Sequence, residues 1–219
     1  MAERRHAHYS LGEEIAHSIT HGLGVVLSVV GLVLLMVRAV RADDPWQIVS
    51  FAVFGATMVV LYTSSTLYHA LKPPRARRVF KILDHGAIYL LIAGSYTPFL
   101  LVSLRGPWGW SMFGVVWGLA IGGIVFKVWF AGRFKLVSTL IYLGMGWLCA
   151  VATKPLLHSV PGPGLLWLLA GGLFYSGGTV FYLWRGMKYH HAVWHLFVLA
   201  GTCCHFWAIY EYVGRAGPG

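Results

Sequence analysis

Charged residues are scarce in this chain, and acidic residues are scarcer still. Only 11% of the 219 residues are charged, 7 of them acidic, against roughly 25% charged residues in a typical soluble domain. Three cysteines are too few for a disulfide-rich scaffold, and a hydrophobic fraction of 58% excludes a disordered chain. Together with a mean hydropathy of +0.67, these shortages indicate a protein whose solvent is the lipid bilayer.

Long apolar segments make up most of the chain. A helix needs roughly 20 residues to cross the hydrocarbon core of a bilayer, and seven segments reach about that length. Proline, glycine or charged residues bound each segment, and the apolar runs are continuous rather than alternating as in a β-barrel. We therefore predict an all-α, seven-helix membrane bundle, preceded by a segment 1–14 and followed by a tail 214–219. The predicted spans are 15–37, 47–71, 84–104, 108–130, 136–153, 165–184 and 191–213.

Lysine and arginine are distributed unevenly between the two sides of this predicted bundle. One side collects 12 of the 17 basic residues and the other side collects five. Because basic loops stay in the cytoplasm, the asymmetry predicts an N-terminus inside the cell and a C-terminus outside, in the cell membrane. The net charge of +10 is thus explained mainly by basic residues in the predicted cytoplasmic loops, and nucleic acid is not expected as a partner. The 12 residues are Arg4, Arg5, Lys72, Arg75, Arg77, Arg78, Lys81, Lys127, Arg133, Lys135, Arg185 and Lys188.

Four ionisable residues are expected to meet at one depth of the bundle. His69 lies near the end of the second predicted span, and Asp84 begins the third. His191 and His195 lie at the start of the seventh span. The predicted topology puts all four on the cytoplasmic side. Because ionisable groups inside a membrane are costly, each of them marks a candidate functional site.

A metal site is one chemistry that this set can support. His191 and His195 are four residues apart, so both rings lie on one face of a helix, and His69 adds a third imidazole. Three histidines with an open fourth position form the ligand pattern of catalytic zinc sites. We therefore predict zinc as the cofactor, with Asp84 and Ser65 placed to hydrogen-bond a zinc-bound water or a ligand ring.

Other roles for these residues remain open at this point. The histidines could instead form hydrogen bonds between helices without any metal. His17 and His21 form a second pair with the same spacing at the start of the first span, and this pair is a rival metal site. His205 lies too far along its helix from His195 to share a site, so we expect a buried hydrogen bond for it. The cysteines lack a metal-binding spacing, and haem would need ligands on opposite sides of its ring.

Three short motifs and one longer segment stand out along the chain. The motifs are Glu13-Glu14 with Thr20-His21-Gly22, then Ser65-Thr66-Leu67-Tyr68-His69 followed by Asp84, then His191-Ala192-Val193-Trp194-His195. They resemble the signature blocks of the progestin and adiponectin receptor superfamily. The segment 84–98, DHGAIYLLIAGSYTP, is similar to that of its bacterial hemolysin III branch in particular. In one departure, His17 occupies a position where the family usually has asparagine.

The resemblance implies a fold and a chemistry. It implies a seven-helix bundle with its N-terminus inside and with zinc held by His69, His191 and His195. The same pattern is similar to that of a wider group of membrane hydrolases that includes alkaline ceramidases. By this resemblance Asp84 is the general base, and Ser65 orients the attacking water or helps to hold the oxyanion.

Three hypotheses follow for the function. The leading one is a zinc-dependent hydrolase that cleaves an amide or ester bond of a membrane lipid near the cytoplasmic leaflet. The second is a receptor or regulator of membrane lipids in which zinc is structural. The third is a cytolysin. In the first two hypotheses the partner is a membrane lipid, either as substrate or as ligand.

Overall fold

The computed structural model describes residues 9–184 and 186–214, and its regular elements are all helical. Seven helical stretches of this described part are long and apolar enough to cross a membrane, which confirms the predicted all-α seven-helix membrane bundle. The α-helices are α1 (Leu11–Arg41), α2 (Pro45–Ala70), α3 (Pro74–Pro98), α4 (Pro107–Phe130), α5 (Lys135–Gly146), α6 (Thr153–Ser159), α7 (Gly162–Leu183) and α8 (His190–Tyr212). A π-helical segment η1 (Phe99–Ser103) extends α3, and a 3-10 segment η2 (Trp147–Ala152) joins α5 to α6. Arg4, Arg5, Arg185 and Arg215, which enter the count of basic residues, lie outside the described residues.

Three membrane-crossing stretches extend at least four residues beyond an end of the predicted spans, and α1 does so at both ends, since it covers Leu11–Arg41 rather than 15–37. α3 begins at Pro74 rather than near Asp84, because a proline suits the first turn of a helix and the basic run that follows contains good helix formers. The fifth stretch continues through η2 and α6 to Ser159. Pro155 does not end it, because this proline lies in the first turn of α6, where no backbone N–H is needed.

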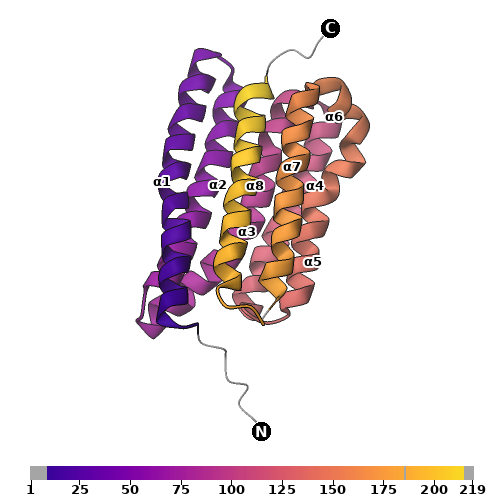
Figure 1. The fold of residues 1–219 in the computed structure, drawn as a ribbon. Helices are drawn as coiled ribbons and strands as arrows, with labels where there is room; N and C mark the ends of the chain where they lie inside the picture. The colour runs from indigo at the N-terminus through magenta and orange to yellow at the C-terminus, as the bar shows by residue number, and fades with distance from the viewer. Residues whose placement is uncertain (1–8, 185, 215–219) are drawn as a thin grey trace.

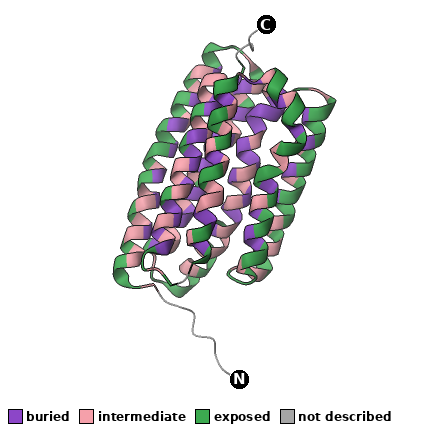
Figure 2. Cartoon of the chain, turned by 45° about the vertical axis from the view of Figure 1, so that its right-hand side comes forward, coloured by how far each residue is buried: buried purple, intermediate pink, exposed green. Residues whose placement is uncertain are grey.

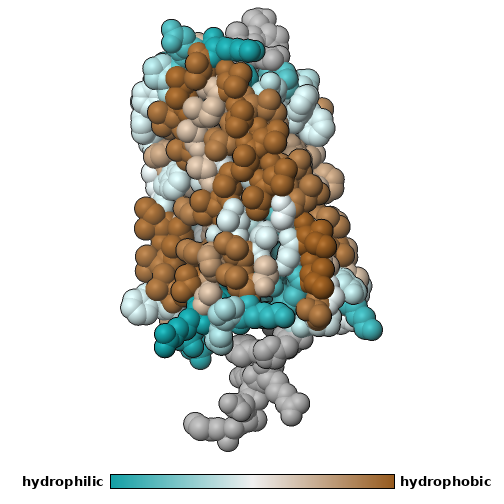
Figure 3. Space-filling view, turned by 90° about the vertical axis from the view of Figure 1, so that its left-hand side faces the viewer, coloured by the Kyte–Doolittle hydropathy of each residue, from teal (hydrophilic) through white to brown (hydrophobic). Residues whose placement is uncertain are grey.

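The outer surface of the bundle is largely apolar. Side chains such as Val26, Ile121 and Leu173 have exposed fractions of 60%, 59% and 57%. Apolar residues cover the middle of the face in Figure 3, and hydrophilic residues gather at its two ends. A soluble protein rarely exposes so much contiguous apolar surface, whereas a bilayer solvates it. The chain is a multi-pass membrane protein.

The helices enclose an interior that carries most of the buried residues. α8 contacts α1 and α7, α1 contacts α2, α2 contacts α3, and α5 contacts both α3 and α7, while α4 packs against α3 (Figure 1). Buried residues face the inside of this arrangement and exposed residues face outward (Figure 2). The described chain starts at one end of the bundle and finishes at the other (Figure 1). We call the end at which α1 starts the N-terminal end.

Polar contacts fix α1 against α8 at both ends. At the N-terminal end, Ser10 and Glu13 form a capping box, and Glu13 Oε1 accepts a hydrogen bond from the Tyr189 N–H at 3.2 Å. At the other end, Arg38 donates to the carbonyl oxygens of Ile209, at 2.9 Å, and Val213, at 2.6 Å. These carbonyls lie at the C-terminal end of α8, where a cation is favourable. The rotation of α1 relative to α8 is therefore defined.

Close packing of α2 against α3 depends on a glycine. A Cβ atom at Gly94 would lie 2.1 Å from Thr57 Oγ1 and 3.0 Å from Thr57 Cβ. The Thr57 hydroxyl donates to the Phe54 carbonyl oxygen at 2.8 Å, so the threonine has a fixed place. A larger residue at position 94 would push apart the two helices that carry Ser65, His69 and Asp84.

Gly94→Val should destabilise the protein in detergent by about 1 to 3 kcal/mol, because the added methyl groups overpack the α2–α3 contact. Gly118→Val is the matched control, since a Cβ atom at Gly118 meets nothing within 4 Å. Thermal unfolding followed by size-exclusion chromatography measures both variants. Equal melting temperatures for the two would show that this contact does not set the α2–α3 distance.

Candidate metal centre

His69, His191 and His195 come together at the N-terminal end of the bundle. Each offers a ligand nitrogen, and the three nitrogens lie within 4.8 Å of one another. Their ring centroids are 5.2 Å apart for His69 and His191, 5.3 Å for His69 and His195, and 4.6 Å for His191 and His195. His69 and His195 are buried and His191 is half-buried. Residues from α2 and α8 thus form the three-histidine group that the spacing and the family resemblance predict.

His17 and His21 belong to the same group rather than to a separate site. The ring centroid of His17 is 4.6 Å from that of His69 and 4.8 Å from that of His191. The His21 ring stacks on the His195 ring at 3.5 Å with an interplanar angle of 8°. We call these five residues, His17, His21, His69, His191 and His195, the histidine cluster.

The tautomer of His69 follows from its hydrogen bond to Glu14. His69 Nδ1 lies 2.7 Å from Glu14 Oε2. An ionised carboxylate only accepts hydrogen bonds, so Nδ1 carries the proton and donates. His69 Nε2 therefore keeps a lone pair, and this buried atom has no hydrogen-bond partner. Histidines that bind metals are oriented in the same way by a carboxylate on the other ring nitrogen.

His195 is oriented by a second pair of acceptors. Its Nδ1 lies 3.1 Å from Thr20 Oγ1 and 3.3 Å from the His17 carbonyl oxygen. A carbonyl oxygen cannot donate, and the Thr20 hydroxyl already donates to the carbonyl oxygens of Ala16 and His17. His195 Nδ1 is therefore the donor, and Nε2 keeps its lone pair. Two of the three histidines are thus set to offer Nε2 to a ligand.

Glu14 is the residue of this site that sequence reasoning did not assign. It accepts a hydrogen bond from Arg77 as well as from His69, so it links α1, α2 and α3. Glu14, His17 and His69 also form a second group whose ligand atoms lie within 4.8 Å of one another. The available signal was the spacing of Glu14, His17 and His21, which puts all three on one face of α1.

Unpartnered nitrogen atoms show that the cluster suits a cation. Both ring nitrogens of His17 and of His21, His69 Nε2 and His191 Nδ1 are buried without a hydrogen-bond partner. A buried polar atom without a partner costs about 1 to 3 kcal/mol, so such atoms are rare unless a ligand pairs with them. A metal ion bound to the lone pairs would remove part of this cost, and neutral imidazole is a common ligand of transition metals.

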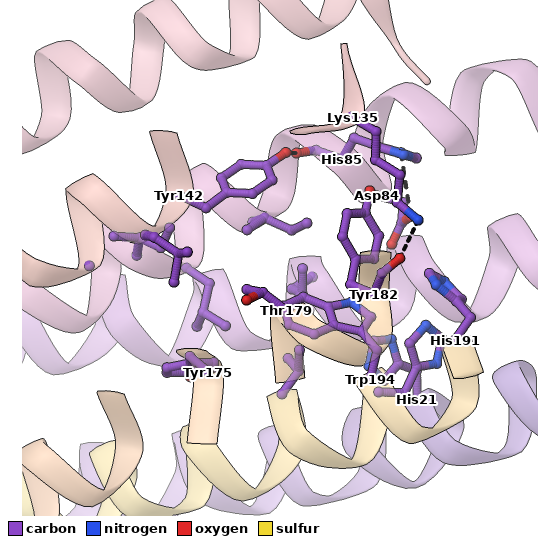
Figure 4. A pocket seen from close by; sticks show the side chains of 18 of the residues that line it. His21, Asp84, His85, Lys135, Tyr142, Tyr175, Thr179, Tyr182, His191 and Trp194 are labelled. Carbon is purple, nitrogen blue, oxygen red and sulfur yellow. Dashed lines mark hydrogen bonds and ion pairs between the residues drawn. The ribbon is translucent and has the colours of Figure 1, made fainter. Parts of the chain in front are cut away.

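A cavity of about 1220 Å³ lies beside the cluster. His21, His191 and His195 line it from α1 and α8, and Asp84 lines it from α3 (Figure 4). His85 Nδ1 lies 3.6 Å from Asp84 Oδ2. Asp84 is not part of either metal-ligand group found in the described residues. Asp84 therefore lines the same cavity as His191 and His195 without belonging to either group of ligand atoms.

Ser65 and His205 lie inside the bundle but belong to neither metal-ligand group of the described residues. Ser65 is fully buried one helical turn before His69, and its hydroxyl oxygen has no hydrogen-bond partner. It is not among the described residues that line the cavity. His205 Nε2 donates to the Leu168 carbonyl oxygen at 3.2 Å, which confirms the predicted buried hydrogen bond.

Comparisons with known proteins agree with the motifs. Residues 9–206 match the family model described as Haemolysin-III related. A Bacillus cereus protein named Hemolysin-3 is 50% identical over 201 residues, which are 92% of this chain and 92% of the relative. A Bacillus subtilis (strain 168) Hemolysin-3 homolog is 49% identical, covering 93% of this chain and 96% of the relative. The human Monocyte to macrophage differentiation factor is 32% identical, covering 93% and 86%.

No solved structure matches the chain. The sequence relatives nevertheless cover nearly all of it, and the family model extends across most of the bundle, from before α1 into α8. The matched region contains all five histidines of the cluster together with Ser65 and Asp84. The chain therefore belongs to the haemolysin III-related family.

Proposed function

We propose that this protein is a zinc-dependent hydrolase that cleaves an amide or ester bond of a membrane lipid. The observation that carries the proposal is the position of the three histidines. Two of them, His69 and His195, have Nδ1 held by acceptors, and His191 and His195 line a cavity that Asp84 also lines. An open three-nitrogen site beside a carboxylate is the arrangement that metal-assisted hydrolysis needs.

In this proposal His69, His191 and His195 hold the metal, and Glu14 and Thr20 keep two of these rings in place. When bound, zinc supplies a Lewis acid that polarises the substrate carbonyl and lowers the pKa of a water molecule. Three imidazoles suit zinc better than they suit calcium or magnesium, which prefer oxygen ligands. His17 is an additional nitrogen donor next to the three, in a position that the family usually fills with asparagine.

Asp84 has the role of general base. Its carboxylate faces the cavity, so it can take a proton from the attacking water and pass it to the leaving amine or alkoxide. Ser65 is buried one helical turn before His69, and its proposed role is to orient the attacking water or to help hold the oxyanion.

The cavity suits a lipid substrate. Apolar side chains of α2, α3 and α8, including Leu61, Leu91 and Val198, line it next to the polar groups already named. An acyl chain could lie along the apolar wall while its amide or ester carbonyl lies near the histidines. The proposed orientation has the N-terminal end of the bundle in the cytoplasm. The described basic residues of the predicted inner side lie in α3, α4, α5 and in the loops before α3, between α4 and α5, and between α7 and α8.

Zinc content tests the ligand set. The purified wild-type protein should contain about one zinc ion per chain, and a His69→Ala, His191→Ala, His195→Ala triple variant should lose nearly all of it. His205→Ala is the matched control, because His205 is also inside the bundle but bonds to the Leu168 carbonyl oxygen. Atomic absorption or plasma mass spectrometry measures all three samples. Equal zinc content in the triple variant and in the wild-type protein would show that these histidines do not bind the zinc.

A regulator of membrane lipids with structural zinc is the second candidate function. The observation that favours it is that the cluster joins three helices, since its residues come from α1, α2 and α8. A metal held there would stabilise the bundle without any turnover.

Asp84→Asn separates the two candidates. In the hydrolase, this change should lower the release of fatty acid from ceramide or phospholipid by about 10²- to 10⁴-fold, because the general base is lost, while zinc content stays the same. Asp43→Asn is the control, since Asp43 is exposed in the turn between α1 and α2. If the wild-type protein releases no fatty acid while a related hydrolase does so in parallel, the hydrolase proposal fails and the regulator remains.

A cytolysin is the third candidate function, and the name of the Bacillus cereus relative, Hemolysin-3, is the reason to test it. Dye release from liposomes that carry this protein, unchanged by loss of His191, would favour a cytolysin over both proposals.

A further inference from the structure

Lys127 is a buried cation within a membrane-crossing helix. It lies near the end of α4, and only 1% of its surface is exposed. Lysines near helix ends usually extend toward the aqueous interface, where the ammonium group stays hydrated. Lys127 instead lines the cavity beside the histidine cluster. The distribution of basic loops explains a lysine at this end of the bundle but does not explain its burial.

Among the residues that the structure describes, the direct contacts of the Lys127 ammonium group are with neutral side chains. Its Nζ donates to Ser138 Oγ at 2.5 Å. It also lies 5.8 Å from the ring centroid of Phe126 and 5.9 Å from that of Tyr142. A buried ammonium group is stable when a charged acceptor pairs with it, and neutral groups offset only part of the cost. The arrangement therefore suits an anion that enters the cavity.

Further cations line the same cavity at the N-terminal end. Lys81 Nζ approaches the backbone at Gly132, where a Cβ atom would lie 2.6 Å from it. Lys135 Nζ donates to the Tyr182 carbonyl oxygen, as Figure 4 shows. Together with Lys127, we call these cavity-lining cations the cationic rim: Lys81, Lys127, Arg133, Lys135 and Lys188.

Acidic side chains do not balance the rim. The acidic residues among the described cavity-lining residues are Glu13 and Asp84. Glu13 accepts hydrogen bonds from Ser10 and from the Tyr189 N–H, and Asp84 lies beside His85. Five cations and two carboxylates leave this part of the cavity positive, and the charge of the buried Lys127 is screened less by water and salt than that of the exposed Arg133 and Lys188. An anionic ligand would be attracted to this position.

We propose that the cationic rim binds the phosphate of an anionic phospholipid, whose acyl region lies along the apolar wall of the cavity. A phosphate group has several acceptor oxygens and can bond more than one ammonium group at once. An acyl chain suits the apolar wall formed by Leu91, Ile92 and Val198. The inference rests on the proposed function only in naming this lipid as the substrate, since binding does not require cleavage.

Lipid binding to a hydrolysis-deficient protein tests the inference. Asp84→Asn is the background, so that bound lipid is not consumed, and native mass spectrometry in detergent counts bound phosphatidylglycerol and phosphatidylcholine. Phosphatidylglycerol should bind more tightly, and Lys127→Met in the same background should weaken its binding by about 10- to 100-fold, the range expected for one charge-assisted hydrogen bond. Phosphatidylcholine carries the same phosphate beside a choline cation, which the other cations of the rim repel, so its binding should be weak in both proteins and change little.

Three controls keep the result interpretable. Lys154→Met removes an exposed lysine outside the cavity lining and should leave the preference unchanged. Lys127→Arg keeps the charge and should keep most of the preference, which separates loss of charge from loss of folding. Glycerol 3-phosphate at millimolar concentration tests a soluble source of the same phosphate chemistry, and it should not displace the lipid.

Two outcomes would overturn the inference. One is equal binding of phosphatidylglycerol by Lys127→Met and by its parent, and the other is complete displacement of the lipid by glycerol 3-phosphate. Failure of the hydrolase proposal would look different. In that case phosphatidylglycerol would bind with the expected dependence on Lys127, but the wild-type protein would release no fatty acid.

Discussion

The hydrogen bond between His69 and Glu14 is the contact on which the site depends. It joins α2 to α1 at 2.7 Å, and Arg77 joins α3 to the same carboxylate. A carboxylate at this depth receives little help from water, so its partners must come from the protein. Because Glu14 accepts the Nδ1 proton of His69, Nε2 keeps its lone pair and is the atom of this ring that could bind a metal. The contacts of one carboxylate, that of Glu14, therefore join three helices and also set the tautomer of His69.

The seven helices and the three-histidine group could be predicted because simple constraints determine them. The bilayer requires long apolar helices, and an i, i+4 spacing on one helix puts His191 and His195 on one face. Alternating helix direction then brings His69 to the same end. The place of His17 and His21 could not be predicted in this way. It depends on the rotation of α1 against α8. Contacts between residues distant in sequence, such as that of Arg38 with the end of α8, define this rotation.

Burial changes the meaning of two charged residues. Asp84 was predicted beside the histidines, and the structure puts it on the wall of the shared cavity, outside the groups of ligand atoms. Lys127 counts in the sequence only as one of the basic residues that set topology, but in the fold it is 1% exposed and faces the same cavity. Both positions depend on which faces of α3 and α4 point into the bundle. The hydropathy pattern of the sequence does not predict this orientation.

Zinc K-edge X-ray absorption spectroscopy of the purified protein tests the central claim, that the histidine cluster is a zinc site, most directly. A zinc ion bound by the cluster should show nitrogen or oxygen ligands at about 2.0 to 2.1 Å, with the outer-shell scattering of at least three imidazole rings. A shell of oxygen ligands without imidazole scattering, or sulfur ligands at about 2.3 Å, would contradict it.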